Sequence, residues 1–428
     1  MTGLATAIGA MLGLMALRIP VFLAMALGVA AFAIAFWPVM RPEVIAQSFL
    51  RGLEGQAFTA IAYFFAVGAI MNAGGMSGRL LDLARTLIAH RPGGLAHANI
   101  GASMLFAGVS GSAVADAAAV GSVMVPAMRK DGYDPAYAAA VTASSATIGL
   151  VIPPSIPMVV FALFTPADVA RLFVAGILPG LMMGLFLMAA SIVIARARGY
   201  PSQPRAGWAA VAVAARRSVL ALLLPVLVVW GMVSGVATVS EIGAVAAVYA
   251  AFVTLVVYRE VTPLGLWRAL VEAAVDCAKI LIIIAVAGAF VWISARMGVA
   301  AGIVSVIEAA GLSPLMFLAA LALALLILGT VLEPVTLLIV VAPVVTPAAL
   351  AIGVDITQLG IVFVLAGAIG LVTPPVGILL FMAAAQANVP LAAVVREGAI
   401  FLAALLAVLA LIVVFPGLTA GVANAVGL

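Results

Sequence analysis

The chain has 428 residues, of which 67% are hydrophobic and only 8% are charged, and its formal net charge is +4. Soluble domains carry about 25% charged residues, so this composition excludes a soluble fold and indicates a polytopic membrane protein. The single cysteine, Cys277, excludes an internal disulfide and a cysteine-based metal site. With two histidines and one cysteine, the chain also lacks a plausible constellation for a membrane enzyme.

Apolar segments in the first half predict, in chain order, spans at about 3–17 and 19–37, an amphipathic link with Arg41 and Arg51, a span at 57–73, an amphipathic link at 77–91, two short apolar pieces at 95–109 and 113–128, a broken span at 135–165 and a last span at 169–195. Each short piece is too short to cross a bilayer core of roughly 30 Å comfortably. The pair, at about 95–128, is therefore expected to form a re-entrant hairpin that enters and leaves on one side.

The second half repeats this order: spans at 218–236 and 240–258, an amphipathic link with Trp267, a span at about 276–295, a link with Arg296 and Glu308, a second hairpin at about 314–350, a broken span at 356–386 and a last span at 390–415. Each half has five crossings, an odd number, so the second half must be inverted relative to the first. We predict an all-α polytopic membrane protein with two inverted-topology repeats, 1–200 and 218–428, joined by a cytoplasmic connector at 201–217.

Two short motifs support the repeat. IGLVIPPS at 148–155 returns as IGLVTPPV at 369–376, and a Gly-x-Asp precedes each of them at the same offset of 221 residues. Asp116 lies ten residues before Pro126, as Glu333 lies ten before Pro343. Each proline removes a backbone donor and clashes with the preceding turn, so a double proline guarantees that the helix breaks there.

The basic residues give an independent prediction of topology. With five crossings per half, fifteen of the 19 Lys and Arg fall on one side and four on the side of the N-terminus. Positive loops face the cytoplasm, so both termini are predicted to be periplasmic. The first hairpin would then open from the cytoplasm and the second from outside.

The predicted site lies where the two breaks and the two hairpin tips meet. Inverted repeats with interrupted helices at mid-membrane are typical of secondary transporters, and a broken helix exposes carbonyls that attract Na⁺ and amides that attract anions. The candidate ion- and substrate-binding residues are Ser110, Gly111, Ser112, Asp116, Ser144, Ser145, Thr147, Pro153, Pro154, Ser155, Thr330, Glu333, Thr336, Gly370, Thr373, Pro374, Pro375 and Gly377. Na⁺ ligands are expected at Ser110, Ser112, Ser145, Gly370 and Thr373, because hard oxygens suit Na⁺ and not transition metals.

Structural roles for the same residues stay open at this point. Small Ser, Thr and Gly also serve as packing residues between membrane helices. Asp116 and Glu333 could instead cap the second helix of each hairpin. Asp134 and Asp355, which follow the paired glycines, are predicted to be helix caps or turn residues.

The run from GVSGSAVAD to IGLVIPPSIPMVVFA and the later run from EPVTLLIVVAP to IGLVTPPVGILLF resemble the large membrane subunit of tripartite ATP-independent periplasmic (TRAP) transporters. The resemblance covers nearly the whole chain. It implies a bacterial inner-membrane permease with no cofactor, driven by Na⁺ as coupling ion and moving as an elevator. It also implies two partners, a small four-helix membrane subunit and an extracytoplasmic binding protein that delivers a small organic acid. The scaffold would comprise the first three spans and the last span of each half.

The alternative function is a stand-alone Na⁺–dicarboxylate or citrate symporter that needs no binding protein. An ion channel is disfavoured, because nothing in the sequence resembles a filter loop and hairpins from opposite sides suit alternating access.

Overall fold

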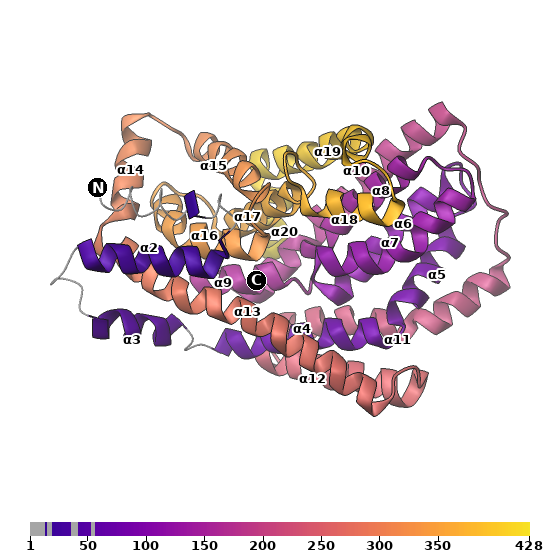
Figure 1. Ribbon diagram of the computed structural model, residues 1–428, viewed down its shortest axis with the longest axis horizontal. Helices are drawn as coiled ribbons and strands as arrows, with labels where there is room; N and C mark the ends of the chain where they lie inside the picture. The colour runs from indigo at the N-terminus through magenta and orange to yellow at the C-terminus, as the bar shows by residue number, and fades with distance from the viewer. Residues whose placement is uncertain (1–12, 15–18, 36–41, 53–55) are drawn as a thin grey trace.

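The computed structural model describes residues 13–14, 19–35, 42–52 and 56–428, and all regular secondary structure within them is helical (Figure 1). The expected first span at 3–17 lies almost entirely outside the described residues. Six described helices are long and apolar enough to cross a membrane, and up to eight candidate spans result if each of two bent helix pairs counts as one. The all-α membrane class predicted from composition is confirmed.

The first half runs α2 (Val21–Ala35), α3 (Pro42–Gly52), α4 (Gln56–Ala73), α5 (Met76–Ile88), α6 (Gly94–Ser110), α7 (Ala113–Lys130), α8 (Pro135–Ala146), η1 (Thr147–Leu150), α9 (Ile156–Phe164) and α10 (Val169–Arg198). The second half runs α11 (Trp208–Val233), α12 (Val239–Phe252), η2 (Val253–Tyr258), α13 (Pro263–Arg296), α14 (Val299–Ala309), α15 (Pro314–Gly329), α16 (Pro334–Ala351), α17 (Ile356–Gly370), α18 (Ile378–Ala387) and α19 (Leu391–Val414), and ends in η3 (Pro416–Leu418) and α20 (Ala420–Ala425).

Local sequence explains where the paired helices begin. The Asp134 carboxylate accepts hydrogen bonds from the backbone N–H groups of residues 136 and 137, at 2.8 and 2.9 Å, and Pro135 occupies the first turn of α8. Asp355 accepts from residues 357 and 358 at the same distances at the start of α17. Both aspartates are therefore helix caps, as predicted, and satisfy donors that the helix leaves unpaired.

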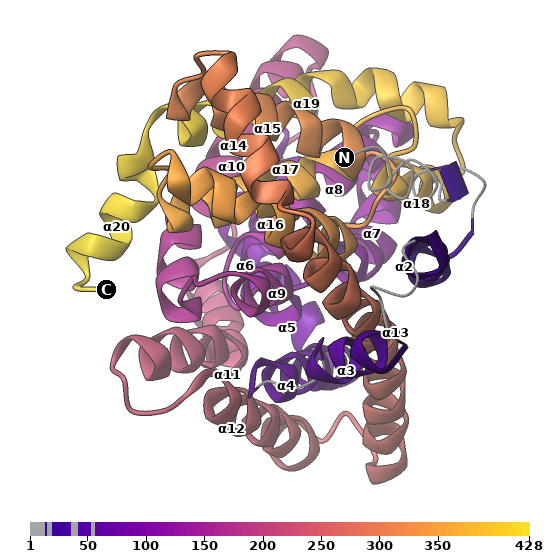
Figure 2. The same cartoon turned by 90° about the vertical axis from the view of Figure 1, so that its left-hand side faces the viewer.

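One layer of the molecule consists of α2, α3, α4, α11, α12 and α13; in Figures 1 and 2, α3, α4, α11 and α12 lie in the lower part and α2 lies at about mid-height. In this layer α4 packs on α12 and α13, α13 packs on α2 and α3, and α11 packs on α12. Helices from both halves of the chain thus interleave in one layer.

The hairpins and broken helices form a second body above that layer, and α10 and α19 belong to it (Figure 2). Helix α10 packs on α6, α17 and α19, and α19 packs on α8 and α17. The resemblance led us to expect the last span of each half in the scaffold with the first three. The structure instead groups both last spans with the hairpin body, because their apolar faces are buried against the broken helices.

Helix α13 departs from the expected division into an amphipathic link and a span. It is a single helix of 34 residues, capped by Thr262 with Pro263 in its first turn. No proline follows Pro263 within it, so nothing interrupts the helix between the expected link around Trp267 and the expected span from about residue 276, and Trp267 lies exposed on its surface. Asp276 and Lys279 are both exposed there and form an i,i+3 ion pair of 2.7 Å. Helix α11 likewise begins at Trp208, ten residues before the expected span and inside the expected connector.

Candidate functional site

The first break separates α8 from α9. After α8 the chain continues as one 3₁₀ turn, η1, passes the buried Pro153 and Pro154, and re-enters a helix at Ile156. Ser155 caps α9, because its hydroxyl accepts a hydrogen bond from the Met158 N–H at 3.4 Å and donates to the Leu150 carbonyl. The break is therefore an ordered, buried piece of backbone.

The tip of the first hairpin contacts this break. Gly111 ends α6 in the left-handed conformation with φ of 58°, and Ser112 caps α7. A Cβ atom added at Gly111 would lie only 3.0 Å from the Pro154 carbonyl oxygen, so the two backbones meet with no room for a side chain. On the other side of the tip, a Cβ at Gly149 would lie 3.5 Å from the Ser112 carbonyl oxygen.

A buried polar network lies behind this contact and joins α6, α7 and α8. Ser103 Oγ lies 3.3 Å from Asp116 Oδ1 and 3.0 Å from Ser145 Oγ. Asn99 donates from Nδ2 to Thr142 Oγ1 at 2.6 Å, and Ser145 donates to Asn99 Oδ1 at 3.4 Å or to the Thr142 carbonyl at 3.2 Å. The hydroxyl of Ser145 is thus bonded within this network, to Ser103 and Asn99 of α6 and to the Thr142 carbonyl of its own helix.

The second break repeats the contact with different residues. Helix α17 ends at Gly370, and α18 begins after Gly377, whose φ of 60° is also left-handed. A Cβ atom at Gly370 would lie 2.5–2.7 Å from backbone atoms of Gly329, which ends α15 at the tip of the second hairpin. Each hairpin tip therefore touches the break in its own half of the chain through glycines, which meet each other at the second tip and meet Pro154 and Ser112 at the first.

Thr373 is the only hydroxyl in the second Gly-Leu-Val-x-Pro-Pro motif. Its Oγ1 donates to the Ile369 carbonyl at 2.8 Å and its side chain is half-buried. Because the hydroxyl proton is donated to a carbonyl of the same helix end, only the lone pairs of the oxygen remain available to bind a cation. At the matching position of the first break, Ile152 offers no oxygen.

The two breaks differ in exposure. Pro153, Pro154 and Ser155 are buried in the first break, whereas Pro374 and Pro375 are exposed in the second. This conformation therefore opens the second break to the surroundings of the chain and keeps the first one closed.

The two acidic residues are not equivalent either. Asp116 is fully buried, with one oxygen bonded to Ser103 and Oδ2 without a hydrogen-bond partner among the described residues. A Cβ at Gly149 would lie 3.6 Å from that free Oδ2. Glu333 is exposed at the N-cap of α16 and makes no side-chain cap hydrogen bond. Capping of α7 is done by Ser112 and not by Asp116.

The halves of the chain are interlocked around the breaks. The η1 turn of the first break and α9 both pack on α17, and α9 also packs on α16 of the second hairpin. Conversely, α18 packs on α7 and α8, and the Gln386 side chain of α18 donates to the Ala117 carbonyl of α7 at 3.2 Å. Each broken helix therefore places its second part against the hairpin in the other half of the chain.

Twelve of the eighteen predicted residues fall into three groups. The first group meets at the first tip and consists of Ser110, Gly111, Ser112, Pro153, Pro154 and Ser155. The second group lines the second tip and consists of Thr330, Gly370, Thr373 and Gly377. The third is the pair Ser144 and Thr147, in which Thr147 Oγ1 donates to the Ser144 carbonyl at 2.6 Å. Sequence reasoning missed Asn99 and Ser103. They are one helical turn apart in an apolar segment, so a polar pair at i,i+4 spacing was the available signal.

The donors available at both tips are hydroxyl and carbonyl oxygens. Among the described residues, no group of three or more His, Cys, Asp and Glu could hold a metal ion. The first tip adds the buried carboxylate of Asp116 beside the Ser112 carbonyl, and the second offers Thr373. This set suits a monovalent hard cation and leaves helix N-termini at α9 and α18 for an anion.

Known proteins resemble this chain over nearly its whole length. A family model described as tripartite ATP-independent periplasmic transporter, DctM component, matches residues 8–418. Over 375 residues the chain is 39% identical to a C4-dicarboxylate TRAP transporter large permease protein of Pseudomonas aeruginosa, covering 88% of each chain. It is 36% identical to the 2,3-diketo-L-gulonate TRAP transporter large permease protein of Escherichia coli, covering 86% of this chain and 87% of that one.

A third relative is the sialic acid TRAP transporter large permease protein of Vibrio cholerae, 34% identical with 87% of this chain and 88% of that one covered. Among solved structures, the YdaH transporter of Alcanivorax borkumensis matches with a TM-score of 0.61 at 14% identity, over 86% of this chain and 87% of that one. The MtrF protein of Neisseria gonorrhoeae matches with a TM-score of 0.54 at 15% identity, over 86% and 83%. These two likenesses concern the fold alone.

Proposed function

The chain belongs to the tripartite ATP-independent periplasmic transporter family as a DctM component, and from that premise we propose that it is a Na⁺-coupled permease subunit importing a small organic acid across the bacterial inner membrane. Relatives whose names specify C4-dicarboxylate, 2,3-diketo-L-gulonate and sialic acid support an organic acid as cargo. A stand-alone symporter is not favoured, because the family match extends over residues 8–418.

The pairing of each hairpin tip with a broken helix is the observation that carries this proposal. Ser110, Ser112 and Gly149 surround one candidate cation position, and Gly370 and Thr373 surround the other. The oxygens there are backbone carbonyls at helix C-terminal ends and hydroxyls, which carry partial negative charge toward a bound Na⁺. The amides that begin α9 and α18 would face the carboxylate of the cargo.

Transport would proceed by an elevator motion of the hairpin body against the layer built from α2, α3, α4, α11, α12 and α13. Two observations support it: the interlocked packing of α9 and α18 makes the hairpin body one unit, and the second break alone is exposed in this conformation. A partner is also required. We propose that a small membrane subunit completes the permease and that an extracytoplasmic binding protein delivers the organic acid, as the names "large permease protein" and "TRAP transporter" suggest for its relatives.

Uptake by liposomes tests the function. The chain is reconstituted with the small subunit, and uptake of labelled C4-dicarboxylate, sugar-acid and sialic acid candidates is measured with and without the cognate binding protein. We expect uptake only with an inward Na⁺ gradient, and at low substrate only with binding protein. Robust uptake by the chain without binding protein would contradict the tripartite assignment.

Thr373→Val tests the second cation position. The change keeps the volume and removes the oxygen, and loss of one buried polar partner costs about 1–3 kcal/mol, so the Na⁺ dependence of uptake should move to about tenfold higher concentration. Ser155→Ala is the matched control, because that hydroxyl caps α9 from beyond the first break and should affect the Na⁺ dependence less. Unchanged Na⁺ dependence together with lower expression would remove Thr373 from the site.

A further inference from the structure

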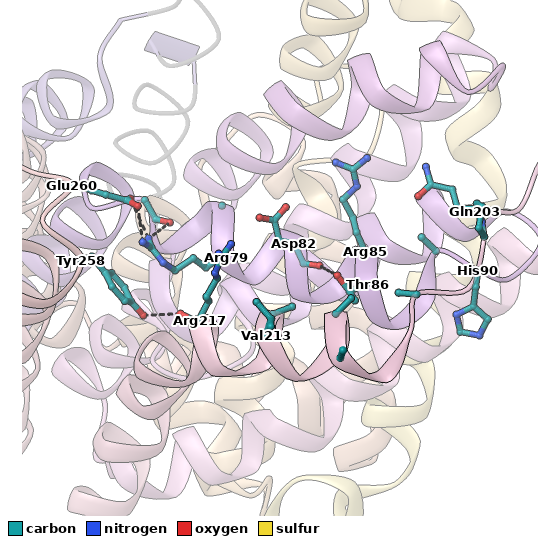
Figure 3. Close-up of a pocket in the computed structure, with 18 residues that line it drawn as sticks. Arg79, Asp82, Arg85, Thr86, His90, Gln203, Val213, Arg217, Tyr258 and Glu260 are labelled. Atoms are coloured by element: carbon teal, nitrogen blue, oxygen red, sulfur yellow. Dashed lines mark hydrogen bonds and ion pairs between the residues drawn. The ribbon is translucent and has the colours of Figure 1, made fainter.

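A groove of about 1270 Å³ lies between α5 and the N-terminal part of α11, away from both breaks. Figure 3 shows Arg79, Asp82 and Arg85 along α5 on one side and Val213 and Arg217 on α11 on the other. The end of η2 closes the groove with Tyr258 and Glu260.

Hydrogen bonds and an ion pair fix the shape of the groove. The Ser218 hydroxyl of α11 donates to the Arg79 carbonyl of α5 at 2.9 Å, and the Tyr258 hydroxyl donates to the Arg217 carbonyl at 2.9 Å. The Arg79 guanidinium is fully engaged, because it pairs with Glu260 at 2.6 Å and lies 3.7 Å from the centre of the Tyr258 ring. The walls are thus held without any help from a ligand.

Two cations in the groove have no such partner. Neither the Arg85 nor the Arg217 guanidinium makes a hydrogen bond or an ion pair with any residue that the structure describes, and Asp82 is the one unpaired acid lining the same groove within that part of the chain. His90 also lines the groove, and a smaller pocket of about 80 Å³ that shares His90 adds Arg205. The available charge of the region is therefore positive.

The rest of the lining is small and apolar. Gly78 on α5 faces Ala210, Val213 and Ala214 on α11, and Val213 is half exposed. Trp208, 80% exposed, begins α11 and stands beside Arg205, whose guanidinium lies 6.0 Å from its ring centre. An apolar slot with arginines at its rim matches a molecule with an anionic head and an apolar tail.

The position of the groove indicates that such a molecule would come from the lipid bilayer. Helix α11 is a candidate membrane span and Trp208 is at its first turn, where tryptophans typically mark the boundary between lipid and water. Basic pockets between membrane helices at that level bind anionic lipid head groups. We propose that the groove binds an anionic phospholipid, with its phosphate at Arg85 and Arg217 and an acyl chain directed from there toward the membrane-spanning part of α11.

Such a lipid would link α5 to α11. Helix α5 follows α4 after the Gly74–Gly75 turn, with a bend of 67° between the two helices. A lipid in the groove would hold α5 at this angle against the lower layer, and α5 itself packs on α6 of the first hairpin. The lipid would therefore stabilise the connection between the two bodies.

The test compares lipids on the chain purified in detergent together with the small subunit. We measure the unfolding temperature during titration with phosphatidylglycerol, cardiolipin, phosphatidylcholine or inorganic phosphate, and quantify the lipids that co-purify. Anionic lipids should raise the unfolding temperature, and phosphatidylcholine and phosphate should not. The double variant Arg85→Gln/Arg217→Gln should bind the anionic lipids about thirtyfold more weakly, because one arginine near an anionic head group changes affinity about fivefold.

The matched control is Arg91→Gln/Arg216→Gln, which removes the same charge from two exposed arginines that do not line the groove. It should leave lipid affinity within about twofold of the unmodified chain, a difference smaller than one arginine contact. Equal loss in both double variants, or equal stabilisation by phosphatidylcholine, would overturn the proposal. Stabilisation by inorganic phosphate alone would also overturn the proposal, because it would identify a free-anion site. Loss of the small subunit, and not of bound lipid, from the Arg85→Gln/Arg217→Gln variant would overturn it as well, because it would identify a protein interface.

Discussion

At the residue scale, the site contains pairs of positions that match in sequence but not in environment. Asp116 and Glu333 occupy matching positions in the sequences of the two halves, yet one is fully buried and bonded to Ser103 while the other is exposed. Thr373 and Ile152 differ in the presence of an oxygen. The two candidate cation positions are therefore expected to have unequal affinities, since the first has a buried carboxylate nearby and the second has a hydroxyl.

The Ser103 hydroxyl is the link between Asp116 and Ser145, so its removal isolates the buried carboxylate. A buried polar group without its partner costs about 1–3 kcal/mol, and Ser103→Ala should lower the free energy of unfolding by that amount. Thermal unfolding in detergent measures the change. Ser122→Ala, on the exposed face of α7 with a bond only to its own helix, should change the free energy by less than about 0.5 kcal/mol. Equal effects of the two substitutions would show that the network contributes nothing.

At the scale of elements, glycines decide how closely each hairpin approaches its break. Between α15 and α17 the backbones of Gly329 and Gly370 are in direct contact. Close approach of this kind between membrane helices depends on small residues, which let backbones meet. The double prolines end the helices, but the glycines bring the freed carbonyls next to the hairpin tip.

Gly370→Ala tests this contact. The added methyl would lie 2.5–2.7 Å from backbone atoms of Gly329, which no side-chain rotation can relieve, so the second tip must move away from α17. We expect a loss of about 1–3 kcal/mol in the free energy of unfolding and loss of Na⁺-dependent uptake. Gly398→Ala in α19 is the matched helical control, because its nearest atoms would be 3.9 Å or more away. A helical Gly→Ala change without a clash stabilises by about 0.4–1 kcal/mol. Similar behaviour of the two variants would reject the close-contact interpretation.

At the scale of the whole molecule, the two halves cannot act as separate domains. Helix α9 packs on the second hairpin and α18 packs on the first, so the hairpin body contains parts of both halves. The layer built from α2, α3, α4, α11, α12 and α13 is interleaved in the same way. The two halves are divisions of the sequence, whereas each of the two packed bodies contains helices from both halves.

Topology is the prediction that belongs to this scale. With fifteen of the 19 basic residues assigned to one side, a cysteine at Ser202 should be shielded from an impermeant reagent in intact cells, and a cysteine at Gly417 should react. Both positions are exposed, and the buried Cys277 is first replaced by serine to give a single-cysteine background. Labelling after permeabilisation is the control for accessibility. Reaction at Ser202 in intact cells would contradict the inverted-repeat count.

The sequence by itself determined the membrane class, the positions of the breaks and the aspartate caps of α8 and α17. Composition, double prolines and capping residues act on the nearest turns of the chain, so their effects can be read without knowing what packs on them. The same local signals were insufficient for α13, where exposed polar residues suggested a boundary that no helix-breaking residue creates.

Only the tertiary structure decided which side chains are buried, which helices share a body and where the cations gather. Asp116 and Glu333 have similar surroundings in sequence, and Asp116 is buried because α6, α8 and η1 pack on α7. The placement of α10 and α19 with the hairpins, the network through Asn99 and Ser103, and the groove between α5 and α11 all arise from contacts between distant segments. Such contacts depend on how whole apolar faces fit together, which local sequence patterns do not specify.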